Sequence, residues 1–199
     1  MLGPLTNTIQ GVVNFTWPMI IISIVILVSF RITYLIKNHE HLVLYKELLM
    51  LSFVIYILCL FQVVTFQDDV VWSGNNFVPF REIFRYNIGS RLFFKNVVGN
   101  MIMFLPFGFF VSYYLKLDKI HLALLLTVIA SFSIETVQMC IGRVFDIDDI
   151  ILNICGGSVG YFMYIILDKV GNKLPNVFKT DWFLNIVSII ILIGLITLL

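Results

Sequence analysis

Charged residues are scarce in this sequence. They make up 13% of its 199 residues, whereas 60% are hydrophobic, and the mean hydropathy is +0.99. A soluble domain carries about a quarter charged residues, so the composition excludes an ordinary soluble protein and indicates an integral membrane protein. The formal net charge of +1 gives no reason to expect a nucleic-acid partner, and we expect none.

The sequence also lacks the usual patterns of disulfide, metal and nucleophile sites. Its cysteines, Cys59, Cys140 and Cys155, lie in apolar runs without CxxC spacing, which argues against a disulfide framework or a zinc site. No HExxH motif and no nucleophile motif is present, and no histidine lies near the polar cluster described below. The sequence therefore identifies no cofactor.

Six apolar runs are long enough to cross a bilayer, which takes about 20 helical residues. They are apolar all round and alternate too weakly for barrel strands, so helices are expected. We predict an all-α membrane protein, a compact bundle of about six transmembrane helices in a single membrane domain, residues 1–199. The predicted spans are Trp17–Ile36, Leu48–Phe66, Val97–Leu115, Leu122–Ile141, Ile150–Leu167 and Trp182–Leu199.

Lysine and arginine counts predict the orientation of these spans. The connections after the first, third and fifth spans, counted with Arg31 near the end of the first span, hold eight of these residues, and the opposite side holds five. Because basic residues are enriched on the cytoplasmic side, both termini are predicted to lie outside.

The long connection between the second and third spans predicts a short amphipathic helix at the membrane interface. Pro79 suits a first helical turn, because its missing N–H would be unpaired there. The alternative is a plain surface loop with a few aromatic residues. The apolar and amide residues that follow Pro79 at helical spacing, with Arg81 and Arg85 between them, are Phe80, Ile83, Phe84, Asn87 and Ile88.

Polar side chains gather where three spans meet the same membrane level. Asn100 lies near the start of the third span, and Glu135 and Gln138 lie near the end of the fourth. Asp149 and Asn153 lie near the start of the fifth. Polar groups inside a membrane are costly, so their convergence predicts a polar pocket, which the predicted orientation places on the extracytoplasmic side.

The start of the fifth span also suggests local roles. Asp148 is explained by capping at a helix N-terminus, which favours acidic residues. Gly156 and Gly160 form a pair of small residues four apart that lets another helix approach closely. Arg143 is a possible partner for Glu135, if the chain turns back after the fourth span.

The middle of the chain resembles the VanZ-like family of bacterial membrane proteins. The resemblance covers roughly residues 75–165, and the motifs follow in the family's order. The matching motifs are NFVPF at 76–80, Asn100 with FLPFGF at 104–109, ETVQ at 135–138, RVFDIDDIILN at 143–153 and GGSVGY at 156–161.

The resemblance implies a multi-pass protein of the bacterial cell membrane with a role at the cell envelope, since the founding member is associated with resistance to the glycopeptide teicoplanin. A membrane lipid or a lipid-linked cell-wall precursor is then the expected partner. The candidate ligand-binding residues are Asn100, Glu135, Gln138, Arg143, Asp146, Asp149 and Asn153.

Two alternatives remain open at the level of sequence. The first is a membrane-embedded enzyme acting on an envelope lipid, with Glu135 or Asp149 as catalytic acid or base. In that case Asp146 and Asp149 could hold a divalent cation. The second alternative is a small transporter with Glu135 as a proton relay, although no inverted repeat is visible.

Overall fold

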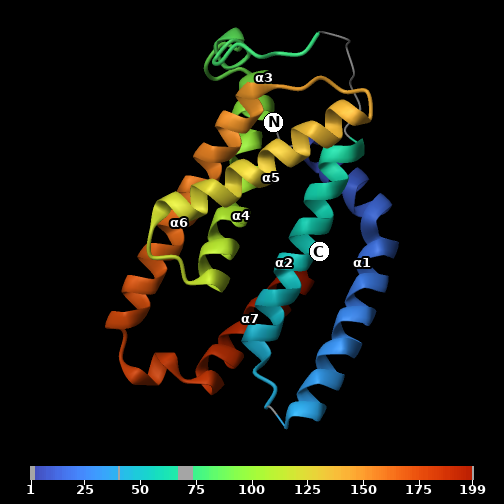
Figure 1. Cartoon of the computed structure of the whole chain (residues 1–199). Coiled ribbons are helices and arrows are strands. Elements are labelled where there is room, and N and C mark those ends of the chain that lie inside the picture. Colours follow the sequence, from blue (N-terminus) through green and yellow to red (C-terminus); the bar gives the residue numbers. More distant parts are fainter. Residues whose placement is uncertain (1–2, 40, 67–73, 199) are drawn as a thin grey trace. The chain divides into compact units, whose positions relative to one another are not determined.

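The computed structural model describes residues 3–39, 41–66 and 74–198, and their regular structure is helical (Figure 1), which confirms the predicted all-α class. Within these described residues, five helical stretches are long and apolar enough to cross a membrane. The sixth predicted span is α7, whose described apolar part, Asp181–Gly194, is shorter. The long helices are α1 (Gly3–Asn38), α2 (Leu44–Phe66), α4 (Gly99–Leu115), α5 (Ile120–Cys140), α6 (Ile147–Lys173) and α7 (Asp181–Leu198). The short ones are η1 (Ile83–Arg85), α3 (Arg91–Phe93), η2 (Phe94–Val98) and η3 (Asn176–Lys179).

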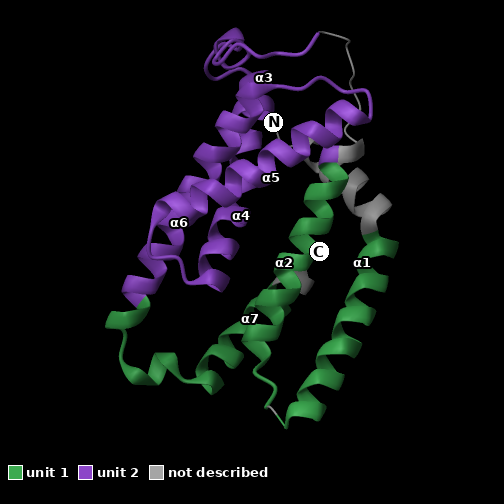
Figure 2. Ribbon diagram, in the orientation of Figure 1, with its two compact units in different colours: residues 1–63, 171–199 green, residues 64–170 purple. Residues whose placement is uncertain are grey.

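The chain divides into two compact units (Figure 2). The first comprises the described parts of residues 1–63 and 171–199, and the second comprises those of residues 64–170. In the first unit, Arg31 Nε donates to both carboxylate oxygens of Glu47 at 2.9 Å. The Tyr45 N–H donates to Asn185 Oδ1 at 3.0 Å and so joins α2 to α7. All the predicted site residues lie in the second unit.

Glycines bring α4 and α6 into backbone contact within the second unit. A Cβ atom placed on Gly156 would lie 2.0 Å from the Met101 carbonyl oxygen, and one on Gly160 would lie 2.1 Å from that of Leu105. Such distances leave no room for any side chain. The predicted close approach at Gly156 and Gly160 is confirmed, and its partner helix is α4.

The third span starts earlier than predicted and is irregular at its beginning. It runs from Arg91 through α3, a π-helical turn at η2 and α4. Ser90 caps its start, because the Ser90 hydroxyl accepts a hydrogen bond from the Phe93 N–H at 3.1 Å. π-Helical turns inside α-helices are frequent at functional sites, and Lys95 and Asn96 lie on this one.

The predicted amphipathic helix behind Pro79 is wrong in its extent. The chain there forms turns and one three-residue 3-10 helix, η1. Phe80 adopts φ 68°, in the left-handed region, which interrupts a right-handed helix directly after Pro79. The side chain of Asp148, described next, provides the contacts that hold this backbone in place.

Candidate polar site at the start of helix α6

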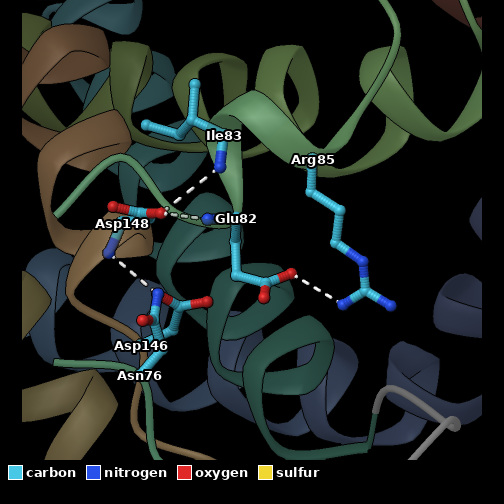
Figure 3. Close-up of polar contacts among 6 residues, drawn as sticks. All are labelled: Asn76, Glu82, Ile83, Arg85, Asp146 and Asp148. Atoms are coloured by element: carbon cyan, nitrogen blue, oxygen red, sulfur yellow. Dashed lines mark hydrogen bonds and ion pairs between the residues drawn. The ribbon is translucent and has the colours of Figure 1, made fainter. Parts of the chain in front are cut away.

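The carboxylate of Asp148 organises the connection that precedes the third span (Figure 3). Asp148 is 1% exposed, and its two carboxylate oxygens accept hydrogen bonds from three backbone N–H groups, of which Figure 3 shows those of Glu82 and Ile83. Asp148 Oδ1 accepts from Phe80, and Oδ2 accepts from Glu82 at 2.7 Å and from Ile83 at 3.3 Å. The prediction that Asp148 merely caps its own helix is therefore wrong, because its side chain holds a loop some 65 residues away in sequence.

The capping role belongs to Asp146. Its Oδ1 accepts from the Asp148 N–H at 2.9 Å, in the manner of a helix N-cap, and from Asn76 Nδ2 at 2.8 Å. The Asp146 N–H donates to Glu135 Oε2 at 2.9 Å, so this residue also joins α6 to α5. Asn76 completes the junction through its backbone, which pairs with Phe145 O at 2.9 Å and Ile147 N at 3.0 Å.

Asp146 lies before the membrane-spanning part of α6, and its environment affects its protonation. Burial raises the pKa of its carboxyl, and the charges of Asp148 and Glu82 act in the same direction. The hydrogen bonds from the Asp148 N–H and from Asn76 lower the pKa but do not cancel the effect of burial. The folded protein therefore binds this proton more tightly than the unfolded chain does.

A pH-dependent effect of Asp146→Asn follows. Because the pKa of Asp146 is raised in the folded state, its protonated carboxyl contributes to stability. This contribution is fully present below the unfolded-state pKa of about 4 and is lost as pH rises through the folded-state pKa. Asparagine keeps an acceptor oxygen but carries no charge. We expect the variant to unfold at a higher temperature than wild type at about pH 8 and at a similar temperature at about pH 4. Thermal unfolding in detergent checks this, and a variant that is less stable at both pH values would contradict it.

Two further pairs join α6 to its neighbours. Asn100 Nδ2 on α4 donates to Asp149 Oδ1. Asn153 Nδ2 donates to Ser131 Oγ on α5 at 2.9 Å, and both residues are buried. Asn153 Oδ1 has no hydrogen-bond partner among the described residues. The structure thus brings the polar residues of the three predicted spans together at one level of the second unit.

Gln138 and Arg143 both reach the last turn of α2. Gln138 Nε2 donates to the Val64 carbonyl oxygen at 3.3 Å, and Arg143 Nη1 donates to the same atom. The last carbonyl groups of a helix have no partner within it, and cations are favoured at that end. Arg143 is therefore a cap for α2, and no ion pair between it and Glu135 occurs among the described residues.

A polar cavity of about 340 Å³ opens beside these contacts. Four of the predicted binding residues line it, namely Asn100, Arg143, Asp146 and Asp149. Glu135, Gln138 and Asn153 are not among its described lining residues. The predicted general acid or base, Glu135, instead accepts the hydrogen bond from Asp146 described above. The other described lining residues are Glu82, Ile83, Tyr86, Leu92, Lys95, Asn96, Val97, Asp148 and Leu152.

Comparison with known proteins agrees with the resemblance. The VanZ/LLP1 family model matches residues 53–168, more than half of the chain. The protein belongs to the VanZ/LLP1 family. No curated protein and no solved structure matches the chain. The matched range includes every residue of the polar site of this VanZ/LLP1 protein.

The predicted divalent cation would bind between Asp146 and Asp149. Within the described parts of this VanZ/LLP1 chain, no group of three or more His, Cys, Asp or Glu residues is arranged to hold a metal ion. Asp146 and Asp149 both line the cavity, but each oxygen named above already accepts a hydrogen bond from an amide. A cation bound between these two carboxylates stays a prediction.

Asn76, Glu82 and Tyr86 belong to the site, although the sequence did not indicate them as site residues. Glu82 and Tyr86 line the cavity, and Asn76 contacts Asp146. Asn76 stands in the NFVPF motif, which gave a signal that this segment matters but not which residue it contacts. Glu82 and Tyr86 do not share a helical face, because the segment is not a continuous helix, so helical spacing could not identify them.

Proposed function

We propose that this VanZ/LLP1 protein resides in the bacterial cell membrane and binds the polar headgroup of a lipid or lipid-linked cell-wall precursor in its polar cavity. The cavity lies on the extracytoplasmic side, and binding there contributes to protection against teicoplanin-type glycopeptides. The observation that carries the proposal is a cavity of about 340 Å³ at the ends of membrane-spanning helices, whose described lining includes two cations and four carboxylates.

The lining residues suit a ligand that carries both phosphate and hydroxyl or amide groups. Among the described residues Lys95 makes no ion pair, so its ammonium is available to a phosphate. Arg143 uses Nη1 for Val64 and keeps further N–H donors, since a guanidinium has five. Asp149 and Asn100, already joined to each other, offer acceptor and donor groups to hydroxyls and amides.

Lys95→Gln tests the proposal most directly. Loss of a charge-assisted hydrogen bond costs about 1.5–3 kcal/mol, so we expect the dissociation constant for a lipid-linked wall precursor to rise about 10- to 100-fold. Binding is measured on the purified protein in nanodiscs, with the precursor as titrant. In cells that depend on this protein for protection, the same variant should lower the inhibitory concentration of teicoplanin.

Lys119→Gln is the matched control, because Lys119 is an exposed lysine directly before α5, outside the cavity lining. It should bind the precursor and protect as wild type does. Wild-type protein that does not bind the precursor, or equal binding by wild type and Lys95→Gln, would refute the proposed role of the cavity. Retained binding without any protection would refute the glycopeptide role alone.

A further inference from the structure

The connection of residues 77–94, here called the arginine loop, presents large apolar side chains to its surroundings. Phe84 is 81% exposed and Ile88 is 90% exposed. Exposed apolar residues this large and this close together mark an interaction surface. The other exposed apolar residues of the loop are Phe77, Val78, Phe80, Leu92 and Phe94.

This exposure is built into the fold. The buried Asp148 carboxylate draws the N–H groups of Phe80, Glu82 and Ile83 inward. The rings of Phe80 and Phe84 lie with their centroids 6.2 Å apart, so the two aromatic residues form a continuous apolar patch. The inward side of the same loop lines the polar cavity through Glu82 and Ile83. The arginine loop thus lines the polar cavity and also exposes large apolar side chains to its surroundings.

The charges on the loop show which kind of surface would cover it. From Phe77 to Lys95 the chain holds four basic residues and one acid. The acid, Glu82, pairs with Arg85 at 3.0 Å, while the side chains of Arg81 and Arg91 are exposed. Basic side chains interleaved with aromatic ones suit the boundary between anionic headgroups and acyl chains.

The position of the loop in the chain is consistent with contact to the headgroup layer of a membrane. Its last residues, Arg91 to Phe94, begin the stretch Arg91–Leu115, which is long and apolar enough to cross a membrane. The 25 residues of this stretch exceed the roughly 20 that cross the hydrocarbon core, so its first residues, which belong to the loop, lie at the level of the lipid headgroups.

We propose that the arginine loop docks onto the headgroup layer of an anionic phospholipid bilayer, with Phe84 and Ile88 inserted at the acyl boundary and Arg81 and Arg91 on the anionic headgroups. The docking does not depend on the proposed function of the cavity. It also places the cavity, whose wall the loop shares, beside the headgroup layer.

The test uses single fluorophores on Phe84→Cys and Ile88→Cys in full-length protein. The native cysteines to be replaced by alanine are Cys59, Cys140 and Cys155. The protein is placed in nanodiscs of zwitterionic lipid, with or without phosphatidylglycerol. We expect both labels to be quenched by a spin label attached to the acyl chain near the headgroup and shielded from aqueous iodide.

Charge reversal tests the anionic preference. Arg81→Glu combined with Arg91→Glu should reduce the lipid quenching about twofold in anionic nanodiscs and leave it unchanged in zwitterionic ones. Lys116→Glu combined with Lys119→Glu, an equal change of charge between α4 and α5, should have no effect.

Three results would overturn the proposal. They are full access of iodide to both labels in anionic nanodiscs, no effect of charge reversal at Arg81 and Arg91, or shielding that depends on protein concentration and so identifies a second copy of the chain as the occupant. Precursor binding by the charge-reversed variant separates this result from the proposed function of the cavity.

Discussion

Gly156→Ala and Gly160→Ala are each expected to destabilise the second unit by about 3 kcal/mol, which corresponds to a fall of about 6–12 °C in melting temperature. The added methyl group would lie 2.0 Å from Met101 O or 2.1 Å from Leu105 O, and both are backbone atoms of α4. A flexible side chain could move aside, but a helix backbone moves only if the whole contact between α4 and α6 opens. Thermal unfolding of the purified protein in detergent measures the effect.

Gly171→Ala is the matched control, since it lies in the same helix and a Cβ atom there would meet no atom of the described residues within 4 Å. Alanine favours helix over glycine by about 1 kcal/mol, so this variant should melt at or above the wild-type temperature. If Gly156→Ala and Gly160→Ala behaved like Gly171→Ala, α4 and α6 would not be in backbone contact in the protein.

Asp148→Ala is expected to release the arginine loop from the rest of the second unit. One hydrogen bond to a charged group is worth about 1.5–3 kcal/mol, and this variant removes all three that the carboxylate accepts. If local opening becomes easier by about 3 kcal/mol, trypsin should cleave after Arg81 and Arg85 about 100-fold faster. Limited proteolysis, followed by mass spectrometry of the fragments, measures this rate.

Two further variants serve as comparisons for the proteolysis rate of Asp148→Ala. Asp148→Asn keeps one acceptor oxygen and turns an amide donor toward N–H groups, so its cleavage rate should lie between those of wild type and Asp148→Ala. Asp118→Ala removes an exposed carboxylate outside the cavity lining and should be cleaved like wild type. A wild-type cleavage rate in Asp148→Ala would show that the carboxylate does not hold the loop.

The sequence predicted the transmembrane architecture well, because long apolar runs have one stable form inside a bilayer. It also located the polar level, since Asn100 and Asp149 came from different spans and meet in the structure. The close packing at Gly156 and Gly160 was equally readable, because small residues four apart form one strip on a helix. Binding by the predicted site residues stays a prediction, since the binding experiment above varies Lys95, which lines the same cavity.

The individual roles of the polar residues could not be predicted from local pattern. Asp146 and Asp148 lie two residues apart at one helix start, where an acid is favoured at either position. Their roles diverge because Asp146 caps α6, whereas Asp148 meets the N–H groups of residues 80, 82 and 83. Arg143 is a similar case, since its partner is a carbonyl group of α2 that is far away in sequence.

The acidic junction between α5 and α6 shows which properties of the site depend on the sequence alone and which depend on the tertiary structure. The sequence by itself determined that this protein is a helical membrane protein and that Glu135 to Asn153 carries its main polar cluster, because apolar length and the cost of polar groups in a membrane are properties of the chain. Only the tertiary structure decided which of these groups support the fold and which face the cavity. That choice depends on backbone N–H and carbonyl groups brought in from distant segments, and these groups are the same in every residue except proline.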